Sequence, residues 1–370
     1  MLQARDKELV AALSRALEKL ASRPVKFMEV CGTHTVAFHR AGLRSLVPQN
    51  ISLLSGPGCP VCVTPQKEIQ KAFQIARREE IILATFGDMM RVPVDSSSLE
   101  KERSMGADVR VVLSALEAVK MAQENRDKSV VFFAVGFETT APTVASAILH
   151  AAQQGIHNFS ILCAHKMIPP AMKALLEGGV VRPGSPQEVK VDGFMCPGHV
   201  SAIIGTHPYE EIAARYSAPC VISGFEPEDM LETLVMLAEM TSEGRAEVKN
   251  QYRRVVKPEG NAVALQLMDR VFRVTDAEWR GLGLIPRSGF RLAEEFSAFD
   301  AESQFELESV VVAEDEQRGC RCGDVLRGSL LPEECPLFGV VCTPATPVGA
   351  CMVSSEGTCG THYRYRSKGN

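Results

Sequence analysis

Short runs of consecutive apolar residues recur along the first part of the chain, and each leads into a turn and then a stretch with helical periodicity. The runs are VKFMEV, ISLLS, IILATF, VRVVL, SVVFFAV, FSILC, VDGFM and CVIS. Val, Ile, Leu and Phe without polar alternation are typical of strands that are buried on both faces. Strands that alternate with helices are joined by right-handed crossovers. The pattern therefore predicts an α/β protein built on parallel sheets.

Helical segments and a change of composition divide the chain further. The stretch 5–20 places its leucines on one stripe, which predicts an amphipathic helix. Further helices are expected near 227–243 and 261–272. From about residue 281 the chain is rich in Gly, Pro and Cys and contains few periodic segments, so we expect irregular structure there.

The strand–helix units form two sets of about four, separated by the charged stretch QENRDK at 123–128. We predict an N-terminal helix with a first α/β domain at 1–125, a second α/β domain at 126–250, and a small irregular domain at 251–370. Ligands of parallel α/β sheets bind beyond the carboxyl ends of the strands. Because the polar turns follow these ends, we expect the two α/β domains to face a shared cleft.

Composition narrows the functional classes. The chain of 370 residues has 40 Lys and Arg against 45 Asp and Glu, a net charge of −5, whereas nucleic-acid-binding proteins usually carry a basic patch. No apolar run approaches the length of a membrane span, and MLQARDKELVAAL lacks the apolar core of a signal peptide. We expect a cytoplasmic protein, monomeric by itself, that binds neither nucleic acid nor membranes.

The twelve cysteines are unevenly distributed, because six of them lie between residues 320 and 359. In a reducing compartment disulfides are rare, and such a concentration of thiols more often holds a metal. Zinc sites usually contain C-x2–4-C pairs, but the short pair here, Cys320 and Cys322, has one intervening residue. The wider gaps favour an iron–sulfur cluster, with zinc as the alternative. The other four cysteines are Cys335, Cys342, Cys351 and Cys359.

The segment GPGCPVC places Cys59 and Cys62 in a rigid turn after a predicted strand. Two thiols at this spacing can form a disulfide or chelate one metal ion. Turns at strand ends usually face solvent, so we expect an exposed and reactive pair. Two buried cysteines are the alternative.

Cys31 and His34 lie in a similar turn, CGTH, after the first predicted strand. A thiolate and an imidazole at this spacing can approach each other, although a lone cysteine in an apolar run is as often a core residue. If Cys59 and Cys62 emerge from another strand of the same sheet, three thiols and one imidazole would form a site suited to a soft metal.

Three more polar residues follow predicted strands. Glu138 in GFETT is a candidate acid–base or partner-contact residue, unless the segment serves only to cap the next helix through Thr139 or Thr140. His199 in PGHVS is a candidate proton shuttle or hydrogen-bonding residue, and a satisfied histidine with no catalytic task is the alternative. Asp88 in TFGDM suits helix capping as well as function. No Gly-containing turn matches a nucleotide-binding fingerprint.

Together these segments resemble the HypD family of hydrogenase maturation factors over nearly the whole chain. The combination of GPGCPVC with CPLFG and SSEGTC is highly specific. The matching segments, in order, are MEVCGTHT, GPGCPVCVTP, TFGDMMRVP, GFETT, PGHVSAIIG, GFEP, NQYRRVV, EWRGLG, RCGDVL, CPLFG and SSEGTC.

The resemblance implies a scaffold for the iron centre of [NiFe] hydrogenase. In that family the protein pairs with the small chaperone HypC, an iron carrying two cyanides and one carbon monoxide, Fe(CN)2CO, is assembled between them, and HypE delivers the cyanide. The family fold has two α/β domains and a third domain with a four-iron four-sulfur (4Fe-4S) cluster. By motif position, Cys31 is the candidate iron ligand with His34 nearby, and Cys59 and Cys62 are the candidate redox pair.

The same motifs assign the cluster ligands and leave one rival function. The cluster ligands implied by the resemblance are Cys322, Cys335, Cys342 and Cys359, with Cys320 and Cys351 outside the motif positions. The rival is an iron–sulfur-linked thiol–disulfide oxidoreductase, which explains the redox pair equally well. It explains Cys31 less well, because a dithiol reductase needs no third thiol on a separate strand.

Overall fold

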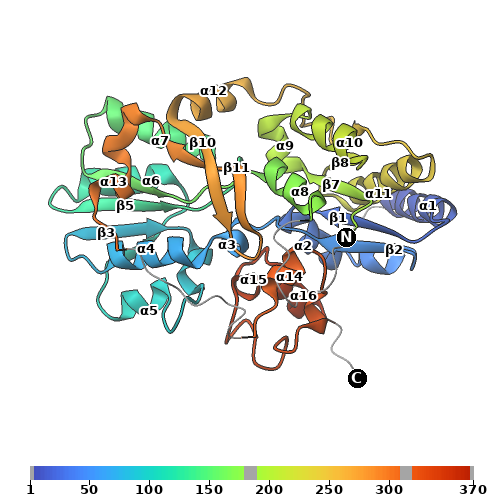
Figure 1. Cartoon of the computed structure of the whole chain (residues 1–370), viewed down its shortest axis with the longest axis horizontal. Coiled ribbons are helices and arrows are strands. Elements are labelled where there is room, and N and C mark those ends of the chain that lie inside the picture. The colour runs from blue at the N-terminus through green and yellow to red at the C-terminus, as the bar shows by residue number, and fades with distance from the viewer. Residues whose placement is uncertain (1–3, 179–189, 309–318, 367–370) are drawn as a thin grey trace.

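Two parallel sheets lie side by side, with a smaller C-terminal unit below them (Figure 1). The computed structural model describes residues 4–178, 190–308 and 319–366. Sheet A has the strand order β2-β1-β7-β8-β9, and sheet B has the order β4-β3-β5-β6. Every strand pair within these two sheets is parallel. The predicted α/β class is therefore confirmed.

The strands are short and mostly buried. Those of sheet A, in sheet order, are β2 (Ile51–Ser55), β1 (Val25–Glu29), β7 (Gly193–Pro197), β8 (Cys220–Ser223) and β9 (Val248–Asn250). Those of sheet B are β4 (Val109–Val111), β3 (Ile81–Thr85), β5 (Ser129–Ala134) and β6 (Phe159–Cys163). β3 is buried at every position, as expected for a strand with helices over both faces.

Helices connect the strands and cover the sheets. Next to sheet A lie α1 (Ala4–Leu20), α2 (Gly32–Arg40), α9 (Gly198–Ile204), α10 (Glu210–Tyr216) and α11 (Pro227–Ser242). Next to sheet B lie α4 (Gln66–Ala76), α5 (Leu99–Ser104), α6 (Ala115–Glu124), α7 (Ala141–Gln153) and α12 (Ala262–Val271). On the connections between the sheets lie α3 (Pro60–Val63) and α8 (Ile168–Leu176). The three helices predicted from periodicity correspond to α1, α11 and α12.

The chain crosses between the two sheets. β1 and β2 lie in sheet A, β3 to β6 form sheet B, and β7 to β9 return to sheet A. Sheet A therefore draws strands from both 1–125 and 126–250, so the sheets do not coincide with the contiguous ranges expected from the sequence. An apolar run indicates a buried strand, but it carries no information about which strand it pairs with.

An antiparallel hairpin follows α12. β10 (Phe272–Trp279) pairs with β11 (Gly283–Leu292), and β11 contacts β6 and α8. The expectation of irregular structure from residue 281 is wrong for this segment. Two thirds of the hairpin positions are exposed or intermediate, so its apolar residues do not form the continuous run that marked the other strands.

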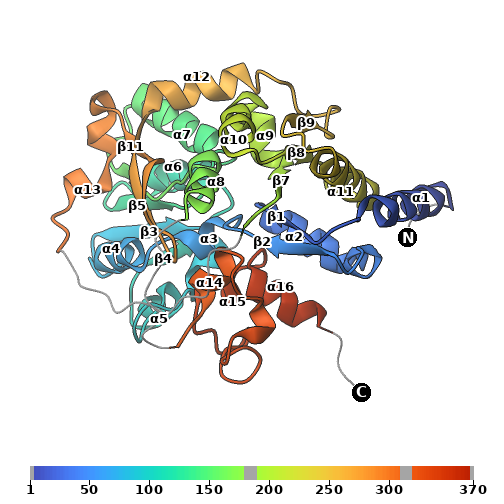
Figure 2. The same cartoon turned by 45° about the vertical axis from the view of Figure 1, so that its right-hand side comes forward.

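The C-terminal unit contains α14 (Cys322–Leu326), α15 (Ala350–Val353) and α16 (Thr358–Tyr365), joined by irregular chain. It lies beneath α2 and α3 (Figure 2), where α16 contacts α2 and α15 contacts α3. One apolar cluster joins this unit to both sheets, since it contains Leu54, Leu83 and Val325. None of the helices in the described ranges is long and apolar enough to cross a membrane.

Candidate functional site

Cys31 lies between the carboxyl end of β1 and the N-terminus of α2. Its backbone is extended, with φ of −150°, and 9% of the residue is exposed. Burial, followed by the charge of Glu356, raises the pKa of the Cys31 thiol to about 12. At neutral pH the residue is therefore a protonated thiol in the free chain.

The GPGCPVC turn packs directly on Cys31. β1 and β2 are parallel neighbours, so their carboxyl ends open at the same edge, and the Gly32 N–H donates to the Gly58 carbonyl at 3.0 Å. A Cβ at position 58 would lie 2.5 Å from Cys31 Cα, so this approach requires glycine. The prediction that Cys31 and the pair Cys59 and Cys62 emerge from strands of one sheet is confirmed.

Cys59 and Cys62 form a disulfide, with Cα atoms 5.3 Å apart. Cys59 precedes α3, and its Sγ accepts a hydrogen bond from the Cys62 N–H at 3.2 Å. The two residues are 3% and 0% exposed. The prediction of an exposed pair is wrong, because α15 of the C-terminal unit packs against α3. Reduction of this disulfide requires an electron path through the protein or a movement that uncovers α3.

His34 and His199 both stack on the ring of Phe225, which follows β8. The ring centroids lie 4.6 Å and 4.0 Å apart, respectively. His34 is fully buried, and its Nε2–H donates to the Gly224 carbonyl at 3.0 Å. Burial lowers the pKa of His34 to about 4, so this imidazole is neutral at physiological pH. His199 is exposed; partial desolvation lowers its pKa, and Glu356 opposes that effect.

The segment SSEG of the C-terminal unit joins the two sheets. Asp88 follows β3, and its Oδ2 accepts hydrogen bonds from Ser354 Oγ at 2.9 Å and from Ser355 N and Oγ at 3.1 Å. On the sheet A side, Thr33 Oγ1 donates to Glu356 Oε1 at 2.7 Å. Asp88 therefore anchors this segment beside the Cys31 turn.

Two acidic residues near Cys31 were not singled out from the sequence. Glu356 contacts the Cys31 turn through Thr33. In the sequence, the only indication of its importance was its position within the motif SSEGTC. Glu29 of β1 is 3% exposed, and its Oε1 accepts hydrogen bonds from Ser55 Oγ at 2.6 Å and from Thr35 Oγ1. Burial raises the pKa of Glu29 to about 7. Its only signal was one acidic residue inside an apolar run.

Glu138 is fully buried and binds the N-terminus of α8. The Ile168 N–H donates to Glu138 Oε1 at 3.0 Å, and burial raises the pKa of Glu138 to about 8. Capping of α7 by a threonine is not seen at Thr140, whose side chain makes no cap hydrogen bond and instead lies 3.2 Å from His165 Nε2. Since the described hydrogen bonds of Glu138 do not reach the Cys31 turn, its acid–base role stays a prediction.

The six C-terminal cysteines all line one small pocket between α14, α15 and α16. Their thiols interact: hydrogen bonds from Cys320 and Cys351 hold the pKa of Cys322 well below its usual value. Over the described ranges, no three His, Cys, Asp or Glu side chains converge as ligands of a single metal ion. The choice of four ligands among the six therefore stays a prediction. The cysteines are Cys320, Cys322, Cys335, Cys342, Cys351 and Cys359, and the apolar wall includes Val325, Leu337, Phe338 and Met352.

Comparison with known proteins identifies the family. The HypD family model, described as the hydrogenase formation hypA family, matches residues 6–366. The chain belongs to the HypD family. Hydrogenase maturation factor HypD2 of Bradyrhizobium diazoefficiens is 46% identical over 365 residues, which cover 98% of this chain and 95% of that protein.

Two further relatives agree with this membership. The hydrogenase expression/formation protein HupD of Azotobacter chroococcum is 47% identical over 352 residues, covering 95% of this chain and 92% of the relative. A putative hydrogenase expression/formation protein of Methanocaldococcus jannaschii is 44% identical over 368 residues, covering 99% of each chain. The HypD resemblance stated from the motifs is therefore confirmed.

In this HypD-family chain, sulfur is placed at three connected positions. The main chain of Cys31 packs against the turn that carries the disulfide. The disulfide lies on α3, and α15, which borders the thiol-lined pocket, packs against α3. Sulfur ligands favour soft metal ions and iron–sulfur clusters. The arrangement is thus suited to binding a soft metal ion beside a group that can exchange electrons.

Proposed function

We propose that the chain is a cytoplasmic maturation factor of [NiFe] hydrogenase, on which the iron unit is assembled before transfer. The cargo is Fe(CN)2CO, and Cys31 is its thiolate ligand. A HypC-type chaperone completes the site, and a HypE-type protein supplies the cyanide. The packing of the GPGC turn on Cys31 carries the proposal, because it sets a thiol beside a disulfide at the carboxyl ends of adjacent strands.

The chemistry of the cargo agrees with this ligand. Iron(II) that carries cyanide and carbon monoxide is soft, and a thiolate suits it. The proton on Cys31 must leave when the metal binds, and Glu356 lies close enough to act electrostatically on both Cys31 and His199. We assign the removal of this proton to Glu356 and the exposed His199. His34, neutral and fixed by Gly224, orients the turn.

The pocket of six thiols is proposed to hold a 4Fe-4S cluster through Cys322, Cys335, Cys342 and Cys359. Cysteine thiolates are the usual ligands of such clusters, and apart from Arg321 and Gly349 the rest of the wall consists of apolar side chains. The bound cluster exchanges single electrons. Opening of the disulfide at α3 consumes two electrons and two protons and yields two thiols, so an external low-potential donor has to supply the electrons.

Infrared spectroscopy of the chain purified without oxygen, together with its HypC-type partner, tests the cargo assignment. Metal-bound carbon monoxide and cyanide absorb in a window that is free of protein bands. We expect these bands in the wild type and in Cys220→Ala, a control at a buried cysteine of β8. The bands should vanish in Cys31→Ala. Bands of wild-type intensity in Cys31→Ala would remove Cys31 from the proposed role.

The disulfide favours one rival, an iron–sulfur-linked thiol–disulfide oxidoreductase. Cys59 and Cys62 are oxidised in the structure and lie on α3, next to the unit with the thiol-lined pocket. An empty infrared window, with iron and sulfide present and a disulfide that a low-potential donor reduces, would establish the rival. A second thiol variant, Cys62→Ala, distinguishes the two functions. It should abolish all activity of an oxidoreductase, whereas in a maturation factor Cys31 can still bind iron.

A further inference from the structure

A cavity of about 890 Å³ opens at the carboxyl end of β6, apart from the sulfur sites. It is bounded by the residues after β6, the first turn of α4, the β10–β11 hairpin and the segment 293–303. None of its lining residues belongs to the Cys31 turn, the disulfide or the thiol-lined pocket. Cavities of this size commonly bind small organic molecules.

Lys166 lies in the wall of this cavity and is nearly buried, with 5% of the residue exposed. Its backbone is fixed, because the N–H donates to the Gly136 carbonyl at 3.0 Å and the residue bridges to Gly289 of β11. Within the described ranges its ammonium takes part in no hydrogen bond or ion pair. Buried lysines are normally paired, whereas the carboxylates of Glu68 and Glu278 act on this ammonium only through space. A ligand can therefore supply its direct partner.

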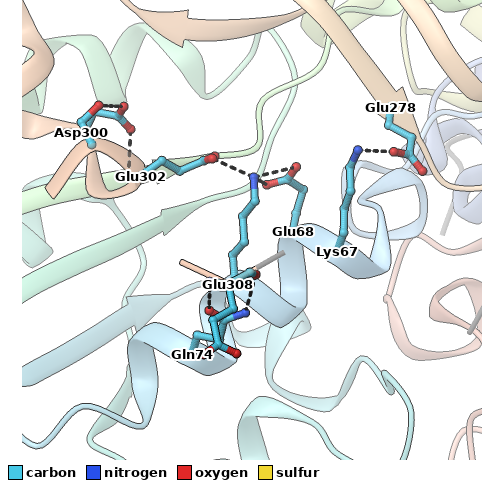
Figure 3. A network of polar contacts seen from close by, with 9 residues as sticks. Lys67, Glu68, Gln74, Glu278, Asp300, Glu302 and Glu308 are labelled. Carbon is cyan, nitrogen blue, oxygen red and sulfur yellow. Dashed lines mark hydrogen bonds and ion pairs between the residues drawn. The ribbon is translucent and has the colours of Figure 1, made fainter. Parts of the chain in front are cut away.

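The charged neighbours of Lys166 are paired with one another. Lys67 forms an ion pair with Glu278. Glu68 and Glu302 share Lys71, at 3.3 Å and 2.8 Å. Figure 3 shows these contacts, which join α4 to Glu278 of β10 and to Glu302 in the short helix α13 (Ala301–Gln304). Glu68 acts on Lys166 only through space, as a smaller effect than the burial that lowers the pKa of Lys166. These acids therefore do not satisfy the ammonium.

Two side chains that shortly precede Lys166 in the chain, those of Cys163 and His165, are uncharged. Burial lowers the pKa of His165 to about 3 and raises that of Cys163 to about 12. The Cys163 thiol donates to the Phe290 carbonyl at 3.4 Å. A neutral imidazole, a bound thiol and a cation together suit an anionic group rather than a metal ion.

The rim of the cavity limits which anion fits, because acidic residues outnumber arginines there. A ligand with several negative charges would be repelled, whereas a single negative group at Lys166 with a neutral or cationic remainder would not. The acidic residues are Asp276, Glu294, Glu295 and Asp300, and the arginines are Arg273 and Arg291.

We propose that this cavity binds a small organic molecule with one carboxylate and a neutral or cationic remainder, and that Lys166 donates a charge-assisted hydrogen bond to the carboxylate. The proposal does not depend on the proposed function at Cys31. Nothing in the sulfur chemistry requires this cavity.

Titration calorimetry on the full chain tests the proposal, with N-acetylarginine as the probe. We expect the probe to bind, and its amide, which lacks the carboxylate, and citrate, which carries three, to bind about tenfold more weakly or not at all. Lys166→Met should weaken binding of N-acetylarginine about tenfold or more. Lys120→Met makes the same change of charge on the exposed face of α6 and should leave the affinity unchanged.

Equal binding of the acid and the amide overturns the proposal, as does unchanged affinity in Lys166→Met or a failure of N-acetylarginine to bind at millimolar concentration. A second measurement applies if Lys166→Met does not fold. In the wild type, the rate at which acetic anhydride modifies Lys166, followed by peptide mass spectrometry, should fall several-fold when the probe is present. An unchanged rate at Lys166 also overturns the proposal.

Discussion

Replacement of Gly58 by alanine should push the GPGC turn away from Cys31. The added Cβ would lie 2.5 Å from Cys31 Cα, whereas ordinary contacts begin near 3.4 Å. The atom that it meets is main chain, which cannot rotate aside, so the turn has to shift by roughly 1 Å. Such overpacking costs about 1–3 kcal/mol, and the weakened Gly32–Gly58 hydrogen bond adds about 1 kcal/mol. We expect Gly58→Ala to lose about 2–4 kcal/mol of stability.

Urea unfolding followed by circular dichroism measures this loss. Gly87→Ala is the matched control, because its Cβ would meet only Val111 Cγ1, at 3.6 Å. The displaced turn should also open the surroundings of Cys31, so alkylation of this thiol, measured by peptide mass spectrometry, should be faster in Gly58→Ala. A loss below about 1 kcal/mol relative to Gly87→Ala, with alkylation at the wild-type rate, would refute the reasoning.

Three further predictions follow from buried or anchoring charges. Asp88→Asn removes the charge that strengthens three hydrogen bonds to the SSEG segment. This substitution should lower the free energy of unfolding by about 1–3 kcal/mol and speed limited proteolysis of the C-terminal unit. An unchanged cleavage rate would contradict the anchoring role. The pKa of Glu138 is raised from 4.5 to about 8 in the folded chain, so folded protein binds this proton more tightly and loses stability as the pH rises from about 4.5 to 8. When the pH is raised from 5.5 to 8.5, the free energy of unfolding of Glu138→Gln should therefore fall by about 2–3 kcal/mol less than that of the wild type. Urea midpoints that change with pH in the same way in both proteins would show that Glu138 does not carry the proton. Arg280 is 8% exposed, and it helps to lower the pKa of Cys322 as a smaller effect than the hydrogen bonds from Cys320 and Cys351. Arg280→Met should therefore lower the reduction potential of the proposed cluster, measured in a redox titration followed by electron paramagnetic resonance. An unchanged potential would show that Arg280 does not act on the cluster.

Local features of the site could be predicted from the sequence, because buried strands and their turns have local signals. The apolar runs before Cys31 and Cys59 located β1 and β2 and placed both turns at one edge of a sheet. The partner of β1 on its other side could not be predicted, since Phe27 pairs with Gly193 far along the chain. A buried strand from either half has the same composition, so nothing local distinguishes the possible pairings.

The contacts of the C-terminal unit with the sheets could not be predicted from the sequence either. The burial of the disulfide depends on α15, and the surroundings of Cys31 depend on Glu356, yet both lie about 300 residues further along the chain. Glu29 was missed for a different reason. An acidic residue in a strand is normally solvent-exposed, whereas this one is stabilised in the interior by hydroxyl groups from Thr35 and Ser55.

The division of sheet A between distant parts of the chain has a consequence for biosynthesis. Sheet B uses only residues 81–163, so it can form on the ribosome while β1 and β2 still wait for β7, and domains do fold as they emerge. Until β7 is translated, Cys31, Cys59 and Cys62 belong to an incomplete sheet, and the C-terminal unit that covers their turns is translated later still. A stalled or shortened nascent chain would therefore present three accessible thiols to stray metal ions, and loading with the proposed iron unit would have to follow translation rather than accompany it.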